Sequence, residues 1–307
     1  MGCCHSKFLI KISALAVLFL PSHFHAQESA KSDNAGVTYD GTYAFQTTIL
    51  METEMKDAKT AIDYWIKTLA ESGGFNIQGL IYNNVDSLIA DAKKGKIDLI
   101  NVAPQHYLKL TRAVETSLAY VPIMGGKKTR KYLLLVRSDS PFSDIKDLYG
   151  KKLAILEGTD VALIYLNTLL LKGGNKEVND FFSGVIEKKK FSQAILSVFF
   201  GQVDACLVAD FSLNAVTEMN PQVGRSLKTI ASSPEYVHLI ACFRKVFNED
   251  LKKRTLERVC NFQNSVEGRQ VLILFGIEGL VPALDSDYAT TKFLMDEYEQ
   301  LRNKVAH

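Results

Sequence analysis

The sequence predicts an α/β protein of two domains, each a mostly parallel sheet flanked by helices. Two observations carry this prediction. Strand-like and helix-like segments alternate along most of the chain, and its 307 residues exceed the usual size of a single domain. Hydrophobic residues make up 47% of the chain and charged residues 23%, which is ordinary for a globular protein and excludes a disordered or collagen-like chain.

The amino-terminal residues 1–26 are typical of a signal peptide. Lys7 and Lys11 precede a short apolar stretch at 12–20, and small residues follow it. This stretch has about half the length that a helix needs to cross a bilayer. A short buried helix is the alternative. We expect an exported, periplasmic protein in which the polar residues 27–36 form a flexible leader.

Charge and cysteine content argue against two kinds of site. The formal net charge is +2, and Lys7 and Lys11 account for the whole excess, so we expect no nucleic-acid interface. Beyond the signal peptide, Cys206, Cys242 and Cys260 are odd in number and lack metal-ligand spacing. We expect them to be small buried residues, and we expect no metal and no cofactor.

Before residue 120 the expected elements alternate regularly. Apolar residues recur at helical spacing from Ala58 to Leu69, which predicts one buried stripe. Pro104 suits the first turn of a further helix. The expected strands are 43–50, 76–82 and 97–102, and the expected helices are 58–69, 88–92 and one that begins near Pro104.

Beyond residue 120 strands and helices alternate again, and the carboxy-terminal part is helical. Gly125, Gly126 and a run of basic residues separate two apolar strands. The expected strands are 120–124, 132–137, 152–156, 205–208, 226–231 and 237–243, and the expected helices are 159–172, 191–200, 249–264, 265–275 and 287–305. This order favours a second unit built like the first.

Several local motifs occur in an order that points to a family. They are Gly95-Lys96-Ile97-Asp98-Leu99, Ala103-Pro104-Gln105-His106-Tyr107, Arg137-Ser138-Asp139-Ser140, Leu148-Tyr149-Gly150-Lys151-Lys152-Leu153-Ala154, Glu157-Gly158-Thr159-Asp160 and Gly201-Gln202-Val203-Asp204-Ala205. Together, over roughly residues 42–283, they resemble the phosphonate-binding branch of the type-two periplasmic binding fold, the solute-binding proteins of phosphonate and phosphate uptake.

The resemblance implies a two-domain periplasmic binding protein with a ligand cleft between the domains. Two crossing segments, near 122–131 and 231–237, would join the domains. The first domain would combine 37–121 with 237–307, and the second would span 122–236. Open parallel sheets bind ligands outside the carboxyl ends of their strands, which agrees with that position for the solute.

The resemblance also places the ligand at the amino end of the helix that begins near Thr159. Backbone N–H groups and the helix dipole favour an anionic oxygen there. Phosphonate binders present several hydroxyl residues at this turn, whereas this chain keeps Thr159 and adds Asp160 and Val161. The Asp160 carboxylate would repel a phosphonate unless it turned away. Simple helix capping by Thr159 or Asp160 is the alternative.

Apolar residues replace polar groups at other positions where the family commonly contacts its solute. Val102, Phe191 and Phe211 are the clearest cases. If they line the cleft, its walls suit a largely apolar ligand such as a lipid or sterol, whose hydroxyls would donate to Asp160 or Asp210. Ordinary core positions are the alternative.

Further candidate ligand contacts lie near expected strand ends, and each is also typical of a packed or structural residue. They are Tyr82, Gln105, His106, Asp210, Tyr236 and His238. Arg130 and Lys131 lie beside the first crossing segment and are placed to meet an anion, although a charge run between strands is more typical of a solvated turn.

From these residues we expect a non-enzymatic, monomeric solute-binding protein that closes around its ligand and serves a membrane transporter. A largely apolar ligand is favoured. One alternative is a small oxyanion, phosphate or phosphonate, carried to an ABC importer, and another is an extracytoplasmic sensor partner that signals to a receptor. We expect no catalytic residue, because the sequence has no metal-binding histidine pair, nucleophile turn or phosphate-binding glycine–lysine loop.

Overall fold

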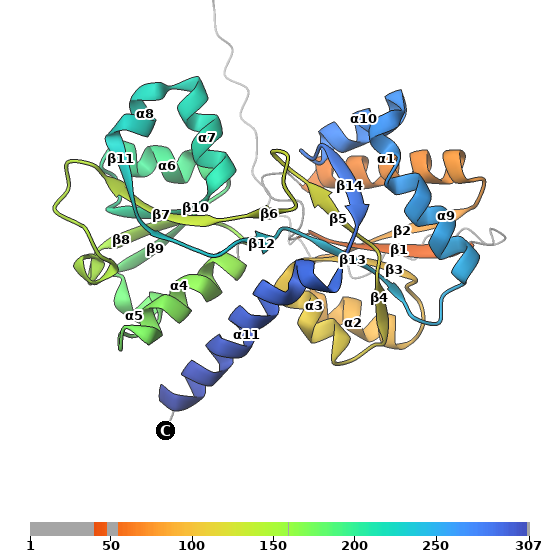
Figure 1. Ribbon diagram of the computed structural model, residues 1–307, viewed down its shortest axis with the longest axis horizontal. Helices are drawn as coiled ribbons and strands as arrows, with labels where there is room; N and C mark the ends of the chain where they lie inside the picture. The colour runs from red at the N-terminus through yellow and green to blue at the C-terminus, as the bar shows by residue number, and fades with distance from the viewer. Residues whose placement is uncertain (1–39, 48–54, 159, 306–307) are drawn as a thin grey trace, which may run out of the picture. The chain divides into compact units, whose positions relative to one another are not determined.

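The computed structural model describes residues 40–47, 55–158 and 160–305 (Figure 1). The expected signal peptide at 1–26 and the expected leader at 27–36 lie outside the described residues. None of the described helices is long and apolar enough to span a membrane.

The first sheet has five strands in the order β2-β1-β3-β13-β4. Their bounds are β1 Gly41–Gln46, β2 Ile77–Tyr82, β3 Leu99–Val102, β4 Thr116–Leu118 and β13 Ile240–Arg244. β1 pairs in parallel with β2 and β3, whereas β13 runs antiparallel to β3 and β4. A strand from far along the chain therefore completes a sheet that is otherwise built before residue 120.

Helices cover both faces of this sheet (Figure 1). One face carries α1 (Met55–Gly73), α9 (Glu249–Val259) and α10 (Val266–Leu274), and the other carries α2 (Val85–Lys93) and α3 (Pro104–Thr111). Successive strand residues point to opposite faces, so Tyr43 and Phe45 join the α1 side of the core while Ala44 joins the α2 side. On the α1 side, Trp65 packs against four aromatic rings. Burying a large apolar side chain contributes about 2–3 kcal/mol.

The second sheet has the strand order β11-β7-β10-β8-β9. Its strands are β7 Tyr132–Arg137, β8 Lys152–Leu156, β9 Gly184–Lys188, β10 Ala205–Ala209 and β11 Leu227–Ser232. One face carries α6 (Phe191–Phe199), α7 (Asp210–Met219) and α8 (Pro221–Ser226), and the other carries α4 (Asp160–Lys172) and α5 (Val178–Phe181) (Figure 1). Every residue of β10 is buried, as a central strand covered on both faces requires.

The predicted α/β class, with sheets flanked by helices, is confirmed. Strand pairing is more mixed than the expected mostly parallel sheets, because each sheet contains two parallel and two antiparallel pairs. Parallel neighbours need a long crossover connection, usually a helix. β7 and β13 instead follow short connecting strands directly, and both run antiparallel to their neighbours.

Two pairs of short strands lie where the chain passes from one sheet to the other. β5 (Tyr120–Ile123) pairs with β14 (Gly279–Pro282), and β6 (Thr129–Arg130) pairs with β12 (Tyr236–Val237), both antiparallel. We call residues 120–131 the first connecting segment and residues 233–239 the second. Pairing of β6 with β12 holds these two segments together.

The last helix, α11 (Asp285–Val305), is bound to helices of both sheets. Glu299 pairs with Arg112 after α3 at 3.4 Å, and Glu297 pairs with Lys172 at the end of α4 at 2.8 Å. Such exposed ion pairs contribute up to about 1 kcal/mol each. Two short 3₁₀ helices, Ile145–Leu148 and Phe262–Asn264, complete the described elements.

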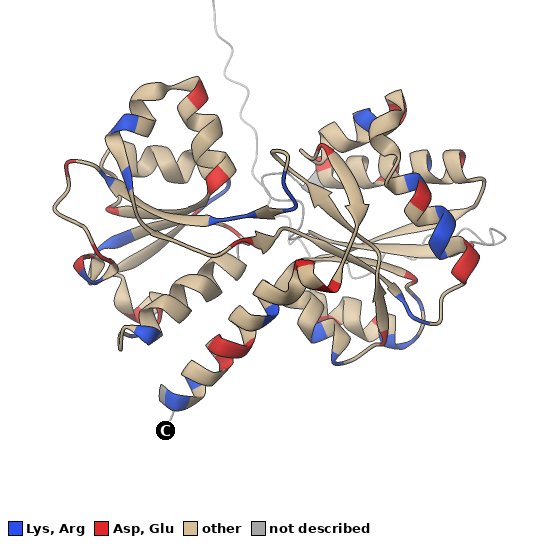
Figure 2. Ribbon diagram, viewed as in Figure 1, with Lys and Arg blue, Asp and Glu red and all other residues tan. Residues whose placement is uncertain are grey.

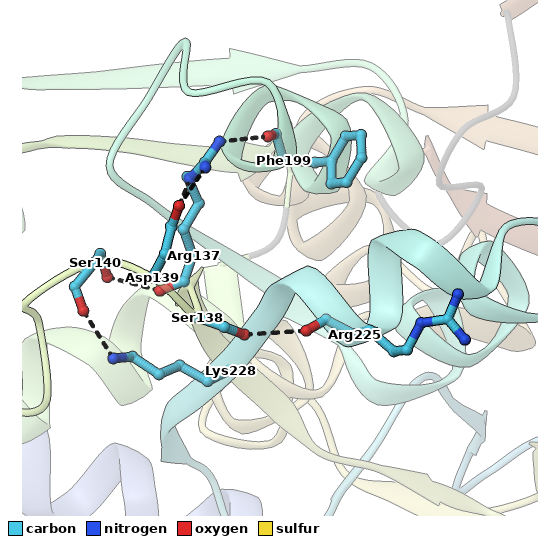
Figure 3. A network of polar contacts seen from close by, with 7 residues as sticks. All are labelled: Arg137, Ser138, Asp139, Ser140, Phe199, Arg225 and Lys228. Carbon is cyan, nitrogen blue, oxygen red and sulfur yellow. Dashed lines mark hydrogen bonds and ion pairs between the residues drawn. The ribbon is translucent and has the colours of Figure 1, made fainter.

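The turn after β7 contains the motif Arg137-Ser138-Asp139-Ser140, and Figure 3 shows its polar contacts. Arg137 donates to Asp139 at 2.9 and 2.6 Å and to the Phe199 carbonyl at 3.0 Å, Ser138 donates to the Arg225 carbonyl at 3.3 Å, and Lys228 donates to the Ser140 carbonyl at 2.9 Å. These bonds tie the turn to the end of α6 and the start of β11. The motif therefore has a structural role in this chain.

The cysteines beyond the expected signal peptide are free thiols. Cys206 in β10 and Cys242 in β13 are buried, which confirms the prediction for these two. Cys260 is partly exposed, and its partial burial raises the pKa of its thiol to about 11.

Candidate functional site

A cavity of about 100 Å³ lies where the two connecting segments meet the first turn of α7. Its lining includes Met124, Lys128, Arg130, Asp210, Phe211 and His238. Figure 2 shows the basic stretch of the first connecting segment around β6. Cationic side chains of this segment and the amino-terminal turn of α7 therefore share one small cavity.

Arg130 is the most unusual residue of this cavity, because it is a cation with only 4% of its surface exposed. Its Nη2 donates to the sulfur of Met124 at 3.0 Å, and its guanidinium lies 4.9 Å from the ring centroid of Phe211. Its Nη1 has no hydrogen-bond partner among the described residues. Burial lowers the pKa of Arg130, as expected for a cation that has lost water.

Neither neighbour of the guanidinium neutralises its charge. A thioether is a weak acceptor, and a ring face contributes about 0.5–2 kcal/mol to binding a cation. Leaving a buried ion without an opposite charge costs several kcal/mol. An anion in the cavity would offset this cost, and the planar guanidinium suits a carboxylate, phosphate or phosphonate that accepts two bonds.

Asp210 adds one acidic group to the same cavity. It is the first residue of α7, and its Oδ1 accepts a hydrogen bond from the Phe211 N–H at 2.9 Å. Its charge raises the pKa of Arg130, but burial has the larger, opposite effect. The arrangement therefore suits a ligand that presents an anionic oxygen to Arg130 and a hydrogen-bond donor to Asp210.

Three carboxylates hold the rest of the first connecting segment. The Gly125 and Gly126 N–H groups donate to Glu278 at 3.0 and 2.9 Å, Lys128 donates to Asp287 at 3.1 Å, and the Thr129 hydroxyl donates to Glu235 at 2.8 Å. Among the described contacts of this segment, the Arg130 guanidinium meets no carboxylate within ion-pair distance, although it is buried next to the cavity.

The predicted site residues of the second sheet divide into two groups. Asp210 and Phe211 line the cavity. Val161 and Phe191 are buried in the core of this sheet, and the rings of Phe191 and Phe211 pack edge to face with their centroids 5.8 Å apart. Thr159 lies outside the described residues, as does the side chain of Asp160, which begins α4.

Of the predicted site residues of the first sheet and of the second connecting segment, His238 lines the cavity. The others do not belong to the lining, although Tyr236 pairs with Arg130 between β12 and β6. Val102, Gln105 and Tyr236 are buried, and Tyr236 stacks on Tyr132. The Tyr82 hydroxyl donates to Asp91 at 3.1 Å, and burial raises its pKa. Val102, one of the apolar residues on which the lipid hypothesis depends, belongs to the core of the first sheet.

Gln46 is a polar residue that the sequence analysis missed. It is buried at the carboxyl end of β1, and its Oε1 accepts from the Ala103 N–H at 3.4 Å and faces His106 Nδ1 at 2.8 Å. Because the amide oxygen can only accept, His106 must carry its proton on Nδ1 to make this bond. A single amide directly after Tyr43, Ala44 and Phe45 was the available signal.

The basic run favours a solvated turn for Arg130 over a contact with an anion, and the burial of Arg130 in the structure corrects the prediction of a solvated side chain. Residues of an extended segment alternate between two faces. Arg130 is in phase with Tyr132, and both are buried, whereas Lys131 between them is exposed. The two-residue period running back from β7 was therefore the signal that could have placed Arg130 inside.

The described residues contain no cluster of three or more His, Cys, Asp or Glu side chains suited to a metal ion. The polar side chains that line the cavity are those of Lys127, Lys128, Thr129, Arg130, Asp210, Asn214 and His238.

Comparison with known proteins gives the family. The family model for the phosphonate ABC transporter periplasmic substrate-binding protein matches residues 48–288, more than three quarters of the chain.

Solved structures show the same fold at low sequence identity. A Xanthomonas citri protein bound to ATP is 14% identical, with a TM-score of 0.63 over 86% of this chain and 98% of that one. PhnD1 from Prochlorococcus marinus, in complex with methylphosphonate, is 13% identical, with a TM-score of 0.63 over 85% and 99%. A binding protein component of an ABC phosphonate transporter from Pseudomonas aeruginosa is 14% identical, with a TM-score of 0.58 over 87% and 98%.

Proposed function

Because the chain belongs to the family of periplasmic substrate-binding proteins of phosphonate ABC transporters, we propose that its solute is a small molecule with an anionic oxygen group. Membership of this family makes the chain a periplasmic solute-binding protein that serves a membrane transporter. The proposal concerns the chemistry of the solute, which we infer to be a small oxyanion such as phosphate, phosphite or a phosphonate.

The observation that carries this proposal is Arg130. Its guanidinium is buried beside a cavity, with Nη1 free of any partner among the described residues. A cation in this state gains more from an anionic ligand than from a neutral one, because the ligand removes an electrostatic cost that the empty protein bears. Hydrogen bonds to a charged partner contribute about 1.5–3 kcal/mol each.

The size of the cavity supports a small solute over a lipid or sterol. Its volume is about 100 Å³, whereas a cavity of about 150 Å³ is filled by a molecule no larger than benzene. Three of the four apolar residues that suggested a lipid, Val102, Val161 and Phe191, are buried core positions. The oxyanion alternative therefore replaces the lipid as our proposal.

We further propose that the chain has two domains, 37–121 with 237–307 and 122–236, which close around the solute. The pairing of β6 with β12 supports this, because it places the two crossing segments next to each other as a hinge requires. We also retain the proposals that residues 1–26 direct export and that the mature protein acts as a monomer.

Thermal unfolding and calorimetry with a panel of anions test the proposed solute. Inorganic phosphate, phosphite and methylphosphonate are titrated into the mature protein, with glycerol as a neutral control. We expect at least one anion to raise the melting temperature in a saturable way, because a ligand that binds only the folded state stabilises it. If none of the three anions changes the melting temperature and organic extraction yields a hydrophobic molecule, the oxyanion proposal is wrong and the lipid hypothesis is favoured.

A further inference from the structure

Glu278 makes an unusual contact with the first connecting segment. The backbone of residues 124–127 forms a tight turn, in which Met124 and Lys127 exchange hydrogen bonds at 2.9 and 3.2 Å. Gly125 and Gly126 have φ values of 57° and 72°, the left-handed conformation that a two-residue hairpin turn of this kind requires. Their N–H groups both point to one carboxylate, that of Glu278, with one oxygen for each donor.

Strand pairing places Glu278 at this turn. The Glu278 N–H donates to the Ile123 carbonyl at 2.8 Å, and β14 follows immediately and pairs with β5. The backbone of Glu278 is therefore bonded to β5, the strand that leads into the turn, and this holds its carboxylate beside the turn. Successive backbone N–H groups in left-handed conformation form a concave site for an anion, and here the chain supplies that anion itself.

The turn also positions Met124, which contacts Arg130. Met124, at its first position, accepts from Arg130 Nη2 at 3.0 Å, and Met124, Gly125 and Lys127 all line the cavity. Glu278 does not line it. Its carboxylate thus acts on the cavity through the turn and Met124, without contact to a bound solute.

We propose that Glu278 is a positioning residue for solute binding, which holds the Gly125–Gly126 turn so that Met124 and Arg130 keep their geometry at the cavity. This role rests on the proposed oxyanion function. Exposed glutamates usually contribute little to a protein, but here both oxygens have backbone donors and the turn borders the site directly.

The variant Glu278→Gln keeps the shape of the side chain and removes one acceptor, because its amide nitrogen would face an N–H donor. We expect affinity for the best-binding anion among phosphate, phosphite and methylphosphonate to fall about tenfold, and amide hydrogen exchange at residues 124–130 to become faster. Glu267→Gln, in an exposed residue of the first turn of α10, is the matched control and is expected to change neither quantity.

A double-mutant cycle with Arg130→Lys separates positioning from a general loss of stability. If Glu278 acts through Arg130, the double variant binds the anion more tightly than the product of the two single effects predicts. Strictly multiplicative losses, or unchanged exchange at 124–130 in Glu278→Gln, would overturn the positioning role while leaving anion binding by the wild-type protein intact. Failure of the wild-type protein to bind any of the three anions would overturn both proposals.

Discussion

Arg130 and Arg244 are both largely withdrawn from solvent, but they are compensated in opposite ways. Arg244, in β13, donates to Asp98 at 2.7 Å and to the Ile97 carbonyl at 3.2 Å, with 22% and 14% of the two charged side chains exposed. Arg130 is more deeply buried and has a sulfur and an aromatic ring as neighbours. Arg244 has its counter-ion within the fold. Arg130 meets no carboxylate within ion-pair distance among the described residues, and in our proposal the solute supplies its counter-ion.

The largest expected effect is a loss of anion affinity when Arg130 is replaced. Arg130→Met removes the cation and keeps an apolar side chain, so affinity for the best-binding anion of the panel should fall about 100-fold. Unfolding by urea should show a folded state at least as stable as the wild type, because a buried unpaired charge has been removed. A variant that binds the anion normally in calorimetry would remove Arg130 from the site.

Arg244→Met should show the reverse pattern. It leaves the largely buried carboxylate of Asp98 without its partner, and we expect the free energy of unfolding to fall by about 2–3 kcal/mol. Anion affinity of the folded protein should stay within about twofold of the wild type, since its contacts lie in the first sheet. The double variant Arg244→Met with Asp98→Asn should recover part of this stability in urea unfolding. An equal loss of stability in the single and the double variant would show that the unpaired Asp98 carboxylate is not the cause.

A smaller effect is expected where Arg130 rests on an aromatic ring. Phe211→Leu keeps an apolar side chain but removes the ring face beneath the guanidinium, so anion affinity should fall about fivefold in calorimetry. Phe211→Tyr retains the ring and is the matched control. Equal affinities for the leucine and tyrosine variants would show that the ring does not orient the arginine.

The smallest effect concerns an ion pair in contact with water. Hydrogen bonding from Lys96 lowers the pKa of Asp91, so this carboxyl is more acidic in the folded than in the unfolded chain. Its contribution to stability is therefore present above about pH 4 and is lost as the pH falls below that value. Asp91→Asn should lower stability at neutral pH by about 0.5 kcal/mol and leave it unchanged at about pH 2. Urea unfolding at both pH values measures this, and a loss of equal size at both would point to the Tyr82 hydrogen bond instead.

Much of the fold follows from local patterns. Period-two alternation and helical spacing of apolar residues act over a few residues, and they located β7, β8, β10 and α6 to within one or two positions. Within the described residues the strand expected at 43–50 ends at Gln46, and residues 48–50 lie outside the described part. The helix expected at 249–264 ends at Val259. The direction in which strands pair was harder to predict from the sequence, because it depends on the short connections that precede β7 and β13.

The site was harder to foresee for a related reason. Hydropathy alone cannot distinguish an apolar wall from core, and Val102 and Phe191 are core. The two-residue period running back from β7 could have placed Arg130 inside. It could not show that β6 pairs with a strand more than 100 residues later, or that Glu278 contacts a turn about 150 residues away. Contacts between such distant parts of a chain leave little trace in the local sequence around either partner.

Each sheet also carries one completely buried thiol on a strand with neighbours on both sides, Cys206 in β10 and Cys242 in β13. Burial raises the pKa of both thiols, so neither presents a reactive thiolate while its sheet is intact. A thiol reagent added under mild denaturant would therefore label each cysteine only when its own sheet opens. The labelling rates of Cys206 and Cys242 therefore report separately how fast each sheet opens, and mass spectrometry of the two labelled peptides measures these rates.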